Sequence, residues 1–377
     1  MSSLSDGLER NARRARDALR RRQLEHGEVG WGPIVVPPPV LPAREGQPRR
    51  VAIVGAGPQG VTLAEAAASI AGVELVGFAE PEAERRADVA QRFGLDPSAC
   101  HAEAADLYAS GPIDLVAVAT PAPHHVRLAA EAHRHGVKRI LVEKPIDVDH
   151  QAAAALAARC AADGVLLAVN YSRRWMSDFR GILAAVRDGA VGDVRTITAQ
   201  TGGGELAMNS SHFFDFGRML LEGDDAVEVS ARLRPTRAPN RRGAQYDDPT
   251  GQVLVRFGSG ARTYIDFEDD LPRGTAVVSI RGEHGTIVVE EHRSLWTLRS
   301  RSTRLWTFPF ARPFTPIEMA TQVMFGMLAE DVPACGAADG LAALDYILAA
   351  HWSSEDGGRA VALPLTDEQR SLRLSFP

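Results

Sequence analysis

Residues 51–60 read Val-Ala-Ile-Val-Gly-Ala-Gly-Pro-Gln-Gly, a short apolar run that ends in a glycine-rich turn. An alanine-rich stretch over 61–70 follows, so the predicted order is strand, turn and helix. Gly55 permits the tight bend, Gly57 leaves room for a pyrophosphate, and Gly60 lets the helix pack against the strand. Phosphate groups bind the unpaired N–H groups where such a helix begins. The turn, with Pro58 and Gln59 between its glycines, therefore predicts a dinucleotide-binding site.

The second predicted strand, Val73 to Ala79, ends at Glu80. A carboxylate at this place accepts hydrogen bonds from the adenosine ribose hydroxyls of a bound dinucleotide. It also repels the 2′-phosphate that distinguishes NADP from NAD. NAD is therefore the predicted cofactor, although Arg85 and Arg86 nearby keep NADP open.

The composition is that of a soluble globular protein of about two domains. The 377 residues are 45% hydrophobic and 24% charged, and the net charge of −6 gives no indication of a nucleic-acid surface. Cys100, Cys160 and Cys335 are scattered and lack metal-ligand spacing, so we expect reduced thiols and no metal site. The sequence has no run of about 18 apolar residues and no signal-peptide core, so we expect a cytoplasmic protein without a membrane partner.

The first 49 residues are predicted to form an N-terminal arm. Residues 1–30 carry many arginines interleaved with acidic residues and have a weak helical periodicity. Residues 31–49 contain six prolines, which favour an extended polyproline conformation. Two interpretations remain open: a loosely docked leader, or an arm that crosses to a neighbouring subunit.

From residue 50 to residue 172 the sequence alternates between strand-like and helix-like stretches. This alternation predicts a Rossmann domain, in which helices cover both faces of a parallel sheet. Ligands of such sheets bind beyond the carboxyl ends of the strands, so the turns after the strands should face one crevice. The predicted strands are Val51 to Val54, Val73 to Ala79, Leu115 to Ala119, Arg139 to Val142 and Val165 to Val169.

Residues 173–377 predict a second domain of the α+β class. A helix over 178–188 and a strand over 194–200 come first, and seven strand-like runs with short, glycine-containing turns lie between residues 226 and 308. This pattern predicts a largely antiparallel open sheet with helices on one face. Two further helices are expected over 317–330 and 337–353. The uncovered face of the sheet is expected to bind another subunit.

Glu143, Lys144 and Pro145 directly follow one of the predicted parallel strands. Lys144 would end that strand on the ligand side, and Pro145 would fix the turn that aims it. The ammonium group can hydrogen-bond a substrate hydroxyl and stabilise negative charge that develops on its oxygen. The alternative is a surface lysine paired with Glu143.

Asn170, Tyr171 and Arg173 follow the last strand of the predicted Rossmann sheet. Amide, phenol and guanidinium groups at a strand's carboxyl end suit a polyol or carboxylate substrate. Arg173, like Arg174, can equally serve as a structural clamp between the two domains, and both interpretations remain open.

A glycine-rich loop over 202–204 leads to a predicted helix that begins near Met208 and carries His212. On this helix His212 would share a face with Met208 and lie near Asn209 and Asp215. A histidine can exchange a proton with a carbinol near neutral pH. The alternative is a histidine that only packs between helices.

These segments, in this order, resemble the glucose-fructose oxidoreductase and inositol dehydrogenase family of NAD(P)-dependent enzymes. The resemblance covers about residues 50–351 and rests on the glycine turn and on residues 120–125, 143–145, 170–174 and 202–215. It implies that Lys144 and His212 are catalytic and that the substrate binds Asn170, Tyr171, Arg173 and Asn209. It also implies that the cofactor binds Gly55, Gly57, Pro58, Gln59, Gly60, Glu80, Thr120, Pro121, His125, Glu143 and Lys144.

The sequence departs from the family pattern at Met208, where an aspartate is usual four residues before the histidine. A carboxylate there would orient the imidazole and stabilise its protonated form, as carboxylates do beside other catalytic histidines. A methionine does neither, so Asn209 or Asp215 would have to orient His212, or Lys144 with Tyr171 would have to handle the proton. Ala122 and Ser210 also replace a usual asparagine and a usual glycine.

The function expected from the resemblance is hydride transfer between NAD(P) and a carbinol or ketone carbon of a sugar, amino sugar or cyclitol, by a homodimer or homotetramer. Met208 motivates an alternative, a reductase of an imine or conjugated substrate. A non-catalytic dinucleotide-binding protein with the same fold is a third interpretation.

Overall fold

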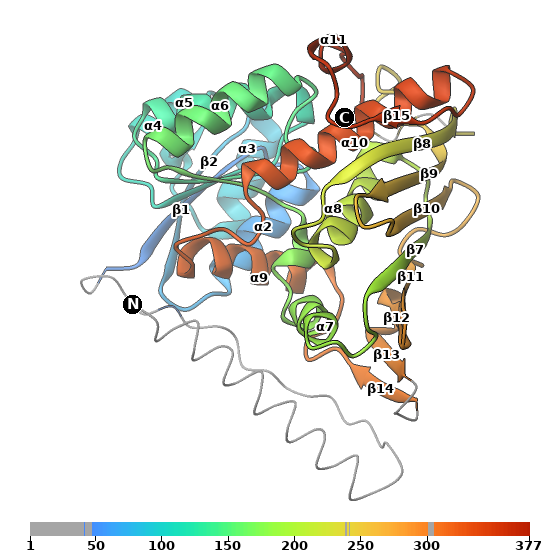
Figure 1. Ribbon diagram of the computed structural model, residues 1–377. Helices are drawn as coiled ribbons and strands as arrows, with labels where there is room; N and C mark the ends of the chain where they lie inside the picture. Colours follow the sequence, from blue (N-terminus) through green and yellow to red (C-terminus); the bar gives the residue numbers. More distant parts are fainter. Residues whose placement is uncertain (1–40, 42–46, 238–239, 241, 301–304) are drawn as a thin grey trace, which may run out of the picture.

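The computed structural model describes residues 41, 47–237, 240, 242–300 and 305–377 of the chain. These residues form two sheets, one of six strands and one of nine, with helices around the first and on one side of the second (Figure 1). The predicted arm lies outside the described residues except for Leu41 and residues 47–49. Leu41 is buried against the first sheet's domain, where its backbone N–H donates to Ala71 O at 3.2 Å.

The first sheet has the strand order β3-β2-β1-β4-β5-β6, and every pairing in it is parallel. The predicted Rossmann sheet is therefore confirmed. Its central strands are buried on both faces, as their continuous apolar sequences require. The strands are β1 (Arg49–Val54), β2 (Val73–Ala79), β3 (Cys100–His101), β4 (Leu115–Val118), β5 (Arg139–Val142) and β6 (Leu166–Val169).

Helices cover both faces of this sheet (Figure 1). They are α2 (Pro58–Ala68), α3 (Ala83–Phe93), α4 (Ala104–Ala109), α5 (His125–Arg134) and α6 (His150–Ala162). The start of α6 is fixed by Asp149, whose side chain accepts a hydrogen bond from the backbone N–H of Ala152 at 2.9 Å. Strand β3 and helix α4 are missing from the sequence-based prediction, because segments of two and six residues are too short to show a periodicity.

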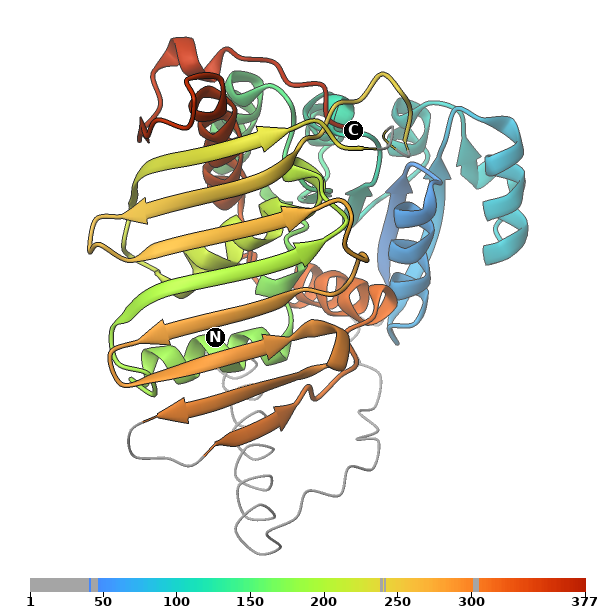
Figure 2. The ribbon, with the colours of Figure 1, turned by 90° about the vertical axis from the view of Figure 1, so that its right-hand side faces the viewer.

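The second sheet has the order β14-β13-β12-β11-β7-β10-β9-β8-β15. Only β7 and β10 pair in parallel within the described strands, so the predicted largely antiparallel sheet is confirmed. Figure 2 shows one face of this sheet, and no helix of the described residues crosses it. The strands are β7 (Val194–Gly202), β8 (Ala226–Arg234), β9 (Thr250–Phe257), β10 (Arg262–Glu268), β11 (Val277–Gly282), β12 (Gly285–Glu290), β13 (Leu295–Ser300), β14 (Trp306–Pro309) and β15 (Val361–Ala362).

The remaining helices are α7 (Ser177–Arg187), α8 (Ser211–Leu220), α9 (Pro316–Ala329), α10 (Ala337–Glu355) and α11 (Asp367–Arg370). Two of them pack on the Rossmann half: α9 contacts α2, and α10 contacts both α6 and β8 and so joins the two sheets. Arg139 of β5 strengthens this contact by donating to the carbonyl oxygens of Met327 and Glu330 at 2.8 and 2.6 Å. The last part of the chain therefore returns to the Rossmann sheet.

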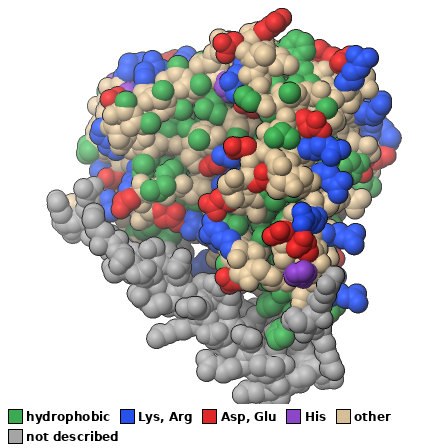
Figure 3. Space-filling model, in the orientation of Figure 1, with side chains coloured by type: hydrophobic (Ala, Val, Ile, Leu, Met, Phe, Trp, Pro, Cys, Tyr) green, Lys and Arg blue, Asp and Glu red, His purple; other side chains and the backbone are tan. Residues whose placement is uncertain are grey.

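The surface of the face in Figure 3 mixes basic and acidic side chains, without a wide region of one sign. Within the described ranges, no helix combines the length and the apolar character that a bilayer crossing requires.

Candidate active site

The glycine turn after β1 has the geometry that its sequence predicts. Gly55 has a φ of +97°, and a Cβ there would lie 2.6 Å from Ala119 O. A Cβ on Gly60 would lie 1.9 Å from Gly55 O, so only glycine allows this approach of helix and strand. Gly57 has no heavy atom within 4 Å of its would-be Cβ. The turn is therefore open at the residue where a pyrophosphate is expected, beside the start of α2 at Pro58.

Glu80, at the end of β2, is buried and tied to the glycine turn. Its carboxylate accepts hydrogen bonds from the backbone N–H groups of Ala56 at 2.8 Å and Glu82 at 3.1 Å. Arg86 donates to the carbonyl oxygens of Glu80 and Pro81, both at 2.7 Å. Because Arg86 binds backbone oxygens and Glu80 supplies the negative charge, the arrangement favours NAD over NADP.

The turns after β4, β5 and β6 meet at the same edge of the sheet. His125 joins two of them, because its Nδ1 and Nε2 atoms lie 2.9 Å from Pro145 O and 2.8 Å from Thr120 O. His125 thus fixes the turn of Thr120 and Pro121 rather than presenting a free ring nitrogen. Its ring is buried.

Glu143 collects hydrogen bonds from two of the predicted site residues. Its Oε1 atom accepts from Gln59 Nε2 at 2.9 Å and from Asn170 Nδ2 at 2.5 Å. These bonds connect the glycine turn, the end of β5 and the end of β6. The Oδ1 atom of Asn170 is buried and has no hydrogen-bond partner in the described chain.

Lys144 follows Glu143 and is buried, contrary to the alternative of a surface lysine. Its Nζ atom donates to the backbone carbonyl oxygen of Met208 and lies 3.9 Å from Met208 Sδ. Burial lowers the pKa of Lys144 to about 8, and the positive charge of Arg242 acts in the same direction. Lys144 is thus a cation near neutral pH that can lose its proton under mildly alkaline conditions.

The segment before α8 differs from the prediction. The expected helix start near Met208 falls inside a π-helical turn, Leu206–Ser210, and the regular helix begins at Ser211. The Asp248 carboxylate holds this turn by accepting hydrogen bonds from the backbone N–H groups of Ala207 at 2.7 Å and Met208 at 2.9 Å. Burial raises the pKa of Asp248 to about 7.

His212 lies on the first turn of α8 against the ring of Tyr171, with ring centroids 5.5 Å apart and planes at 89°. Its Nδ1 atom is buried and lacks a hydrogen-bond partner among the described residues. Burial, and then the charges of Arg173 and Lys144, lower the pKa of His212 well below its ordinary value. The imidazole is therefore neutral at physiological pH.

Neither residue that was expected to replace the missing aspartate orients His212 through a hydrogen bond. Asn209 Nδ2 donates to Gly204 O at 3.0 Å and to Glu205 Oε2 at 3.1 Å. Asp215 accepts two hydrogen bonds from Arg174 Nε, at 2.7 and 2.9 Å. Tyr171 provides a ring contact, and burial raises the pKa of its hydroxyl, so it keeps its proton.

Arg173 has the environment of a structural clamp. It is buried and forms two hydrogen bonds with Glu291, from Nε at 2.6 Å and from Nη2 at 2.7 Å. Its guanidinium carbon also lies 4.5 Å from the centre of the Phe213 ring. These contacts link the end of the Rossmann sheet to the second sheet, and they favour the clamp over a substrate contact.

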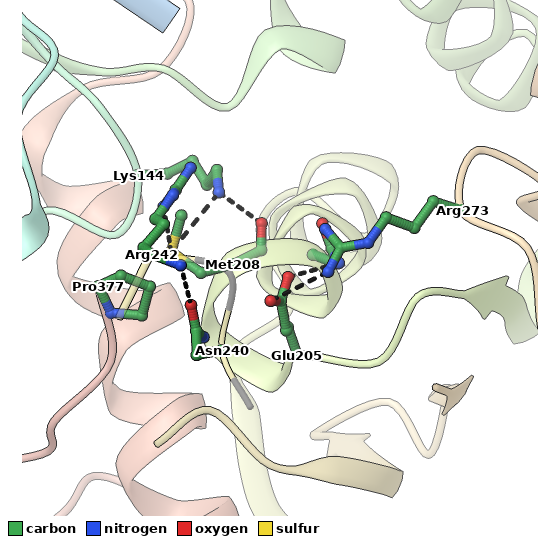
Figure 4. Close-up of a pocket in the computed structure, with 8 residues that line it drawn as sticks. Lys144, Glu205, Met208, Asn240, Arg242, Arg273 and Pro377 are labelled. Atoms are coloured by element: carbon green, nitrogen blue, oxygen red, sulfur yellow. Dashed lines mark hydrogen bonds and ion pairs between the residues drawn. The ribbon is translucent and has the colours of Figure 1, made fainter. Parts of the chain in front are cut away.

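A cavity of about 210 Å³ lies beside Lys144 (Figure 4). Met208 contributes to this lining, and its backbone carbonyl oxygen accepts the hydrogen bond from Lys144. The lining residues are Lys144, Glu205, Met208, Asn209, Asn240, Arg242, Arg273 and Pro377.

Sequence reasoning missed Asp248, Arg242 and Arg273 as site residues. Arg242 and Asp248 lie in the loop between β8 and β9, and Arg273 lies between β10 and β11. A polar loop residue has no periodicity that marks it, and only the folded sheet brings these loops to Lys144.

Comparison with known proteins agrees with this geometry. Residues 49–171 match the model of an oxidoreductase family with an NAD-binding Rossmann fold, and residues 195–288 match the GFO/IDH/MocA C-terminal domain. The inositol 2-dehydrogenase of Rhizobium meliloti (strain 1021) is 26% identical over 258 residues, which are 65% of this chain and 76% of that relative.

Two solved structures share the fold over nearly their whole length. Levoglucosan dehydrogenase in complex with NADH and levoglucosan has a TM-score of 0.75 at 19% identity, covering 85% of this chain and 100% of its own. An inositol dehydrogenase homologue from Azotobacter vinelandii, complexed with NADH and myo-inositol, has a TM-score of 0.72 at 16% identity, covering 84% and 98%. The chain therefore belongs to the Gfo/Idh/MocA family of NAD-binding oxidoreductases, as the resemblance predicted.

Proposed function

We propose that this chain is a dehydrogenase that moves hydride between NAD and a carbinol or ketone carbon of a sugar, amino sugar or cyclitol. The observation that carries the proposal is the position of Lys144. Lys144 is buried at the end of β5 and lines the cavity. It directly follows Glu143, which is hydrogen-bonded to Gln59 of the glycine turn. Inositol and levoglucosan dehydrogenases among the relatives support this substrate class.

The residues around the glycine turn suit NAD. The open position at Gly57, the N-terminus of α2 and the carboxylate of Glu80 would hold its pyrophosphate and ribose. Bound NAD would supply the nicotinamide that accepts or returns the hydride.

The chain's own residues would manage the charge and the proton. The Lys144 ammonium group stabilises the alkoxide character that develops on the reacting oxygen. The neutral imidazole of His212, held against Tyr171, accepts the carbinol proton during oxidation and returns it during reduction. Asn170, through its free Oδ1 atom, and Asn209, in the cavity wall, bind substrate hydroxyls.

The test is a Lys144→Ala variant, assayed by NADH absorbance over a panel of polyols, cyclitols and ketosugars. Removal of one charge-stabilising donor costs on the order of 10²- to 10³-fold in kcat. Unchanged turnover on a substrate of the parent enzyme would remove the proposed role of Lys144.

A second candidate is the reduction of an imine or conjugated double bond. It is favoured because no carboxylate of the described residues forms a hydrogen bond with His212 Nδ1. A Met208→Asp variant that gains polyol dehydrogenase activity would support it. NAD binding without turnover on either kind of substrate would instead favour the non-catalytic interpretation.

We also infer a homodimer or homotetramer formed through the face of the second sheet that no described helix crosses (Figure 2). We further propose a domain boundary near residue 172. The free thiols of Cys100, Cys160 and Cys335 support a cytoplasmic location. Light scattering after gel filtration measures the oligomeric state, and a monomeric mass would contradict the inference.

A further inference from the structure

The cavity beside Lys144 carries an excess of positive charge. Its lining includes the cations Lys144, Arg242 and Arg273, the carboxylate of Glu205, and Pro377, the last residue of the sequence. Glu205 pairs with Arg273 at 3.0 Å, whereas among the described residues neither Lys144 nor Arg242 forms an ion pair. Figure 4 shows both of these side chains gathered around Met208.

Lys144 and Arg242 converge on one thioether. Arg242 Nη1 lies 3.3 Å from Met208 Sδ, and Lys144 Nζ lies 3.9 Å from the same atom. A thioether sulfur is a weak acceptor and carries no charge. Across the described chain, the Arg242 guanidinium has no ion pair, and its backbone N–H donates to Asn240 Oδ1 at 3.0 Å.

The other carboxylates near Lys144 are engaged elsewhere. Glu143 accepts hydrogen bonds from Gln59 and Asn170, and Asp248 accepts two backbone N–H groups of the π-helical turn. The positive charge of Arg242 therefore acts on Lys144 and disfavours its protonated form. Two cations within 4 Å of a neutral sulfur form a site that an incoming carboxylate would neutralise.

We propose that the substrate is an acid: a hydroxy acid of the sugar or polyol class, whose carboxylate binds Arg242 while its reacting hydroxyl binds Lys144. This rests on the proposed function and names its substrate class. A guanidinium binds a carboxylate through two parallel hydrogen bonds, a geometry that a neutral hydroxyl cannot match. Because both cations surround one sulfur atom, the carboxylate lies close to the reacting carbinol carbon.

The experiment measures binding to the NAD complex by calorimetry, with acids paired to neutral counterparts. The probes are D-gluconate against D-glucitol and D-glucuronate against D-glucose. The protein is tested as the parent, as Arg242→Gln, and as the control Arg237→Gln, an exposed arginine nearby whose partner is Asp270 at 3.0 Å.

We expect at least one acid to bind the parent on the order of 10- to 100-fold more tightly than its neutral partner, as for hydrogen bonds to a charged group. The Arg242→Gln variant should lose this preference, and Arg237→Gln should keep it. The proposal is overturned if neither acid binds better than its partner, or if Arg242→Gln keeps the preference. Turnover is measured separately: neutral sugars that are oxidised without any preference for acids would overturn the acid proposal and leave the dehydrogenase function standing.

Discussion

Lys144 donates a hydrogen bond through Nζ to the backbone carbonyl oxygen of Met208, and so joins the end of β5 to the turn before α8. The acceptor is a main-chain atom, so this bond does not depend on the side chain at residue 208. The thioether of Met208 adds no charge beside the ammonium group. A substitution at residue 208 can therefore change the charge beside Lys144 without removing the main-chain hydrogen bond that positions it.

A Met208→Asp variant should raise the pKa of Lys144 above its value of about 8, because a carboxylate would replace the sulfur that lies 3.9 Å from Nζ. Met208→Leu is the matched control and should leave that pKa unchanged. The alkaline limb of kcat/KM against pH reports the shift. An alkaline limb at the same pH in the parent and in both variants would contradict a direct effect of residue 208 on the pKa of Lys144.

The pH dependence of alcohol oxidation should follow Lys144. The amine is protonated below about pH 8 and neutral above it, so kcat/KM should fall as pH rises through about 8. In Lys144→Arg the charge persists to much higher pH, so the falling limb should disappear while kcat is reduced. Persistence of that limb in the arginine variant would assign it to another group.

Asp248 should act as a positioning residue for Lys144. Its carboxylate fixes the N–H groups of Ala207 and Met208, and Met208 in turn offers its carbonyl oxygen to Lys144. Asp248→Asn replaces one acceptor oxygen by a donor, so kcat should fall on the order of 10²-fold through misplacement, with NAD binding retained. Asp247→Asn, a change at the exposed neighbour, is the control. A purely structural role would lower the melting temperature and leave kcat of the folded fraction unchanged.

Arg173 should contribute mainly to stability. Replacing it with methionine leaves Glu291 as a buried charge without its partner, at a cost of about 3–5 kcal/mol in the free energy of unfolding. The double variant Arg173→Met with Glu291→Leu should recover much of this loss, because no unpaired charge remains. Urea denaturation measures the free energy of unfolding of the single and the double variant. A raised KM with unchanged stability would instead support the predicted substrate contact.

Gly57 and Gly60 should respond differently to alanine. At Gly57 a Cβ meets nothing within 4 Å, so Gly57→Ala should fold normally and weaken NAD binding about tenfold or more by occupying the phosphate's approach. At Gly60 a Cβ would lie 1.9 Å from Gly55 O, so Gly60→Ala should be unstable. Melting temperature and NAD titration separate the two effects. Normal NAD affinity in Gly57→Ala would contradict the placement of the pyrophosphate.

The Rossmann half was predictable because its signals are local. Apolar runs gave strands within one or two residues of those observed, as for Val73–Ala79 and Leu115–Val118. The rule that ligands bind beyond the carboxyl ends of parallel strands then brought Glu80, Lys144 and Asn170 to one edge.

The rest of the site depends on long-range structure. The π-helical turn begins after Glu205, which has a φ of +69°, and it is held by Asp248 about 40 residues later in the chain. Arg242 becomes a site residue only because the β8–β9 loop reaches Met208. The parallel pairing of β7 with β10 likewise joins strands that are not consecutive.

The return of α9 and α10 to the Rossmann sheet has a consequence for synthesis on the ribosome. Domains usually fold in the order in which they emerge, the N-terminal one first. Here α9, which packs against α2, is translated only after most of the chain has been made. The same holds for Gly336, which forms a backbone bridge with Ala168. The helix face of α2 that packs against α9 therefore stays uncovered until translation is nearly complete.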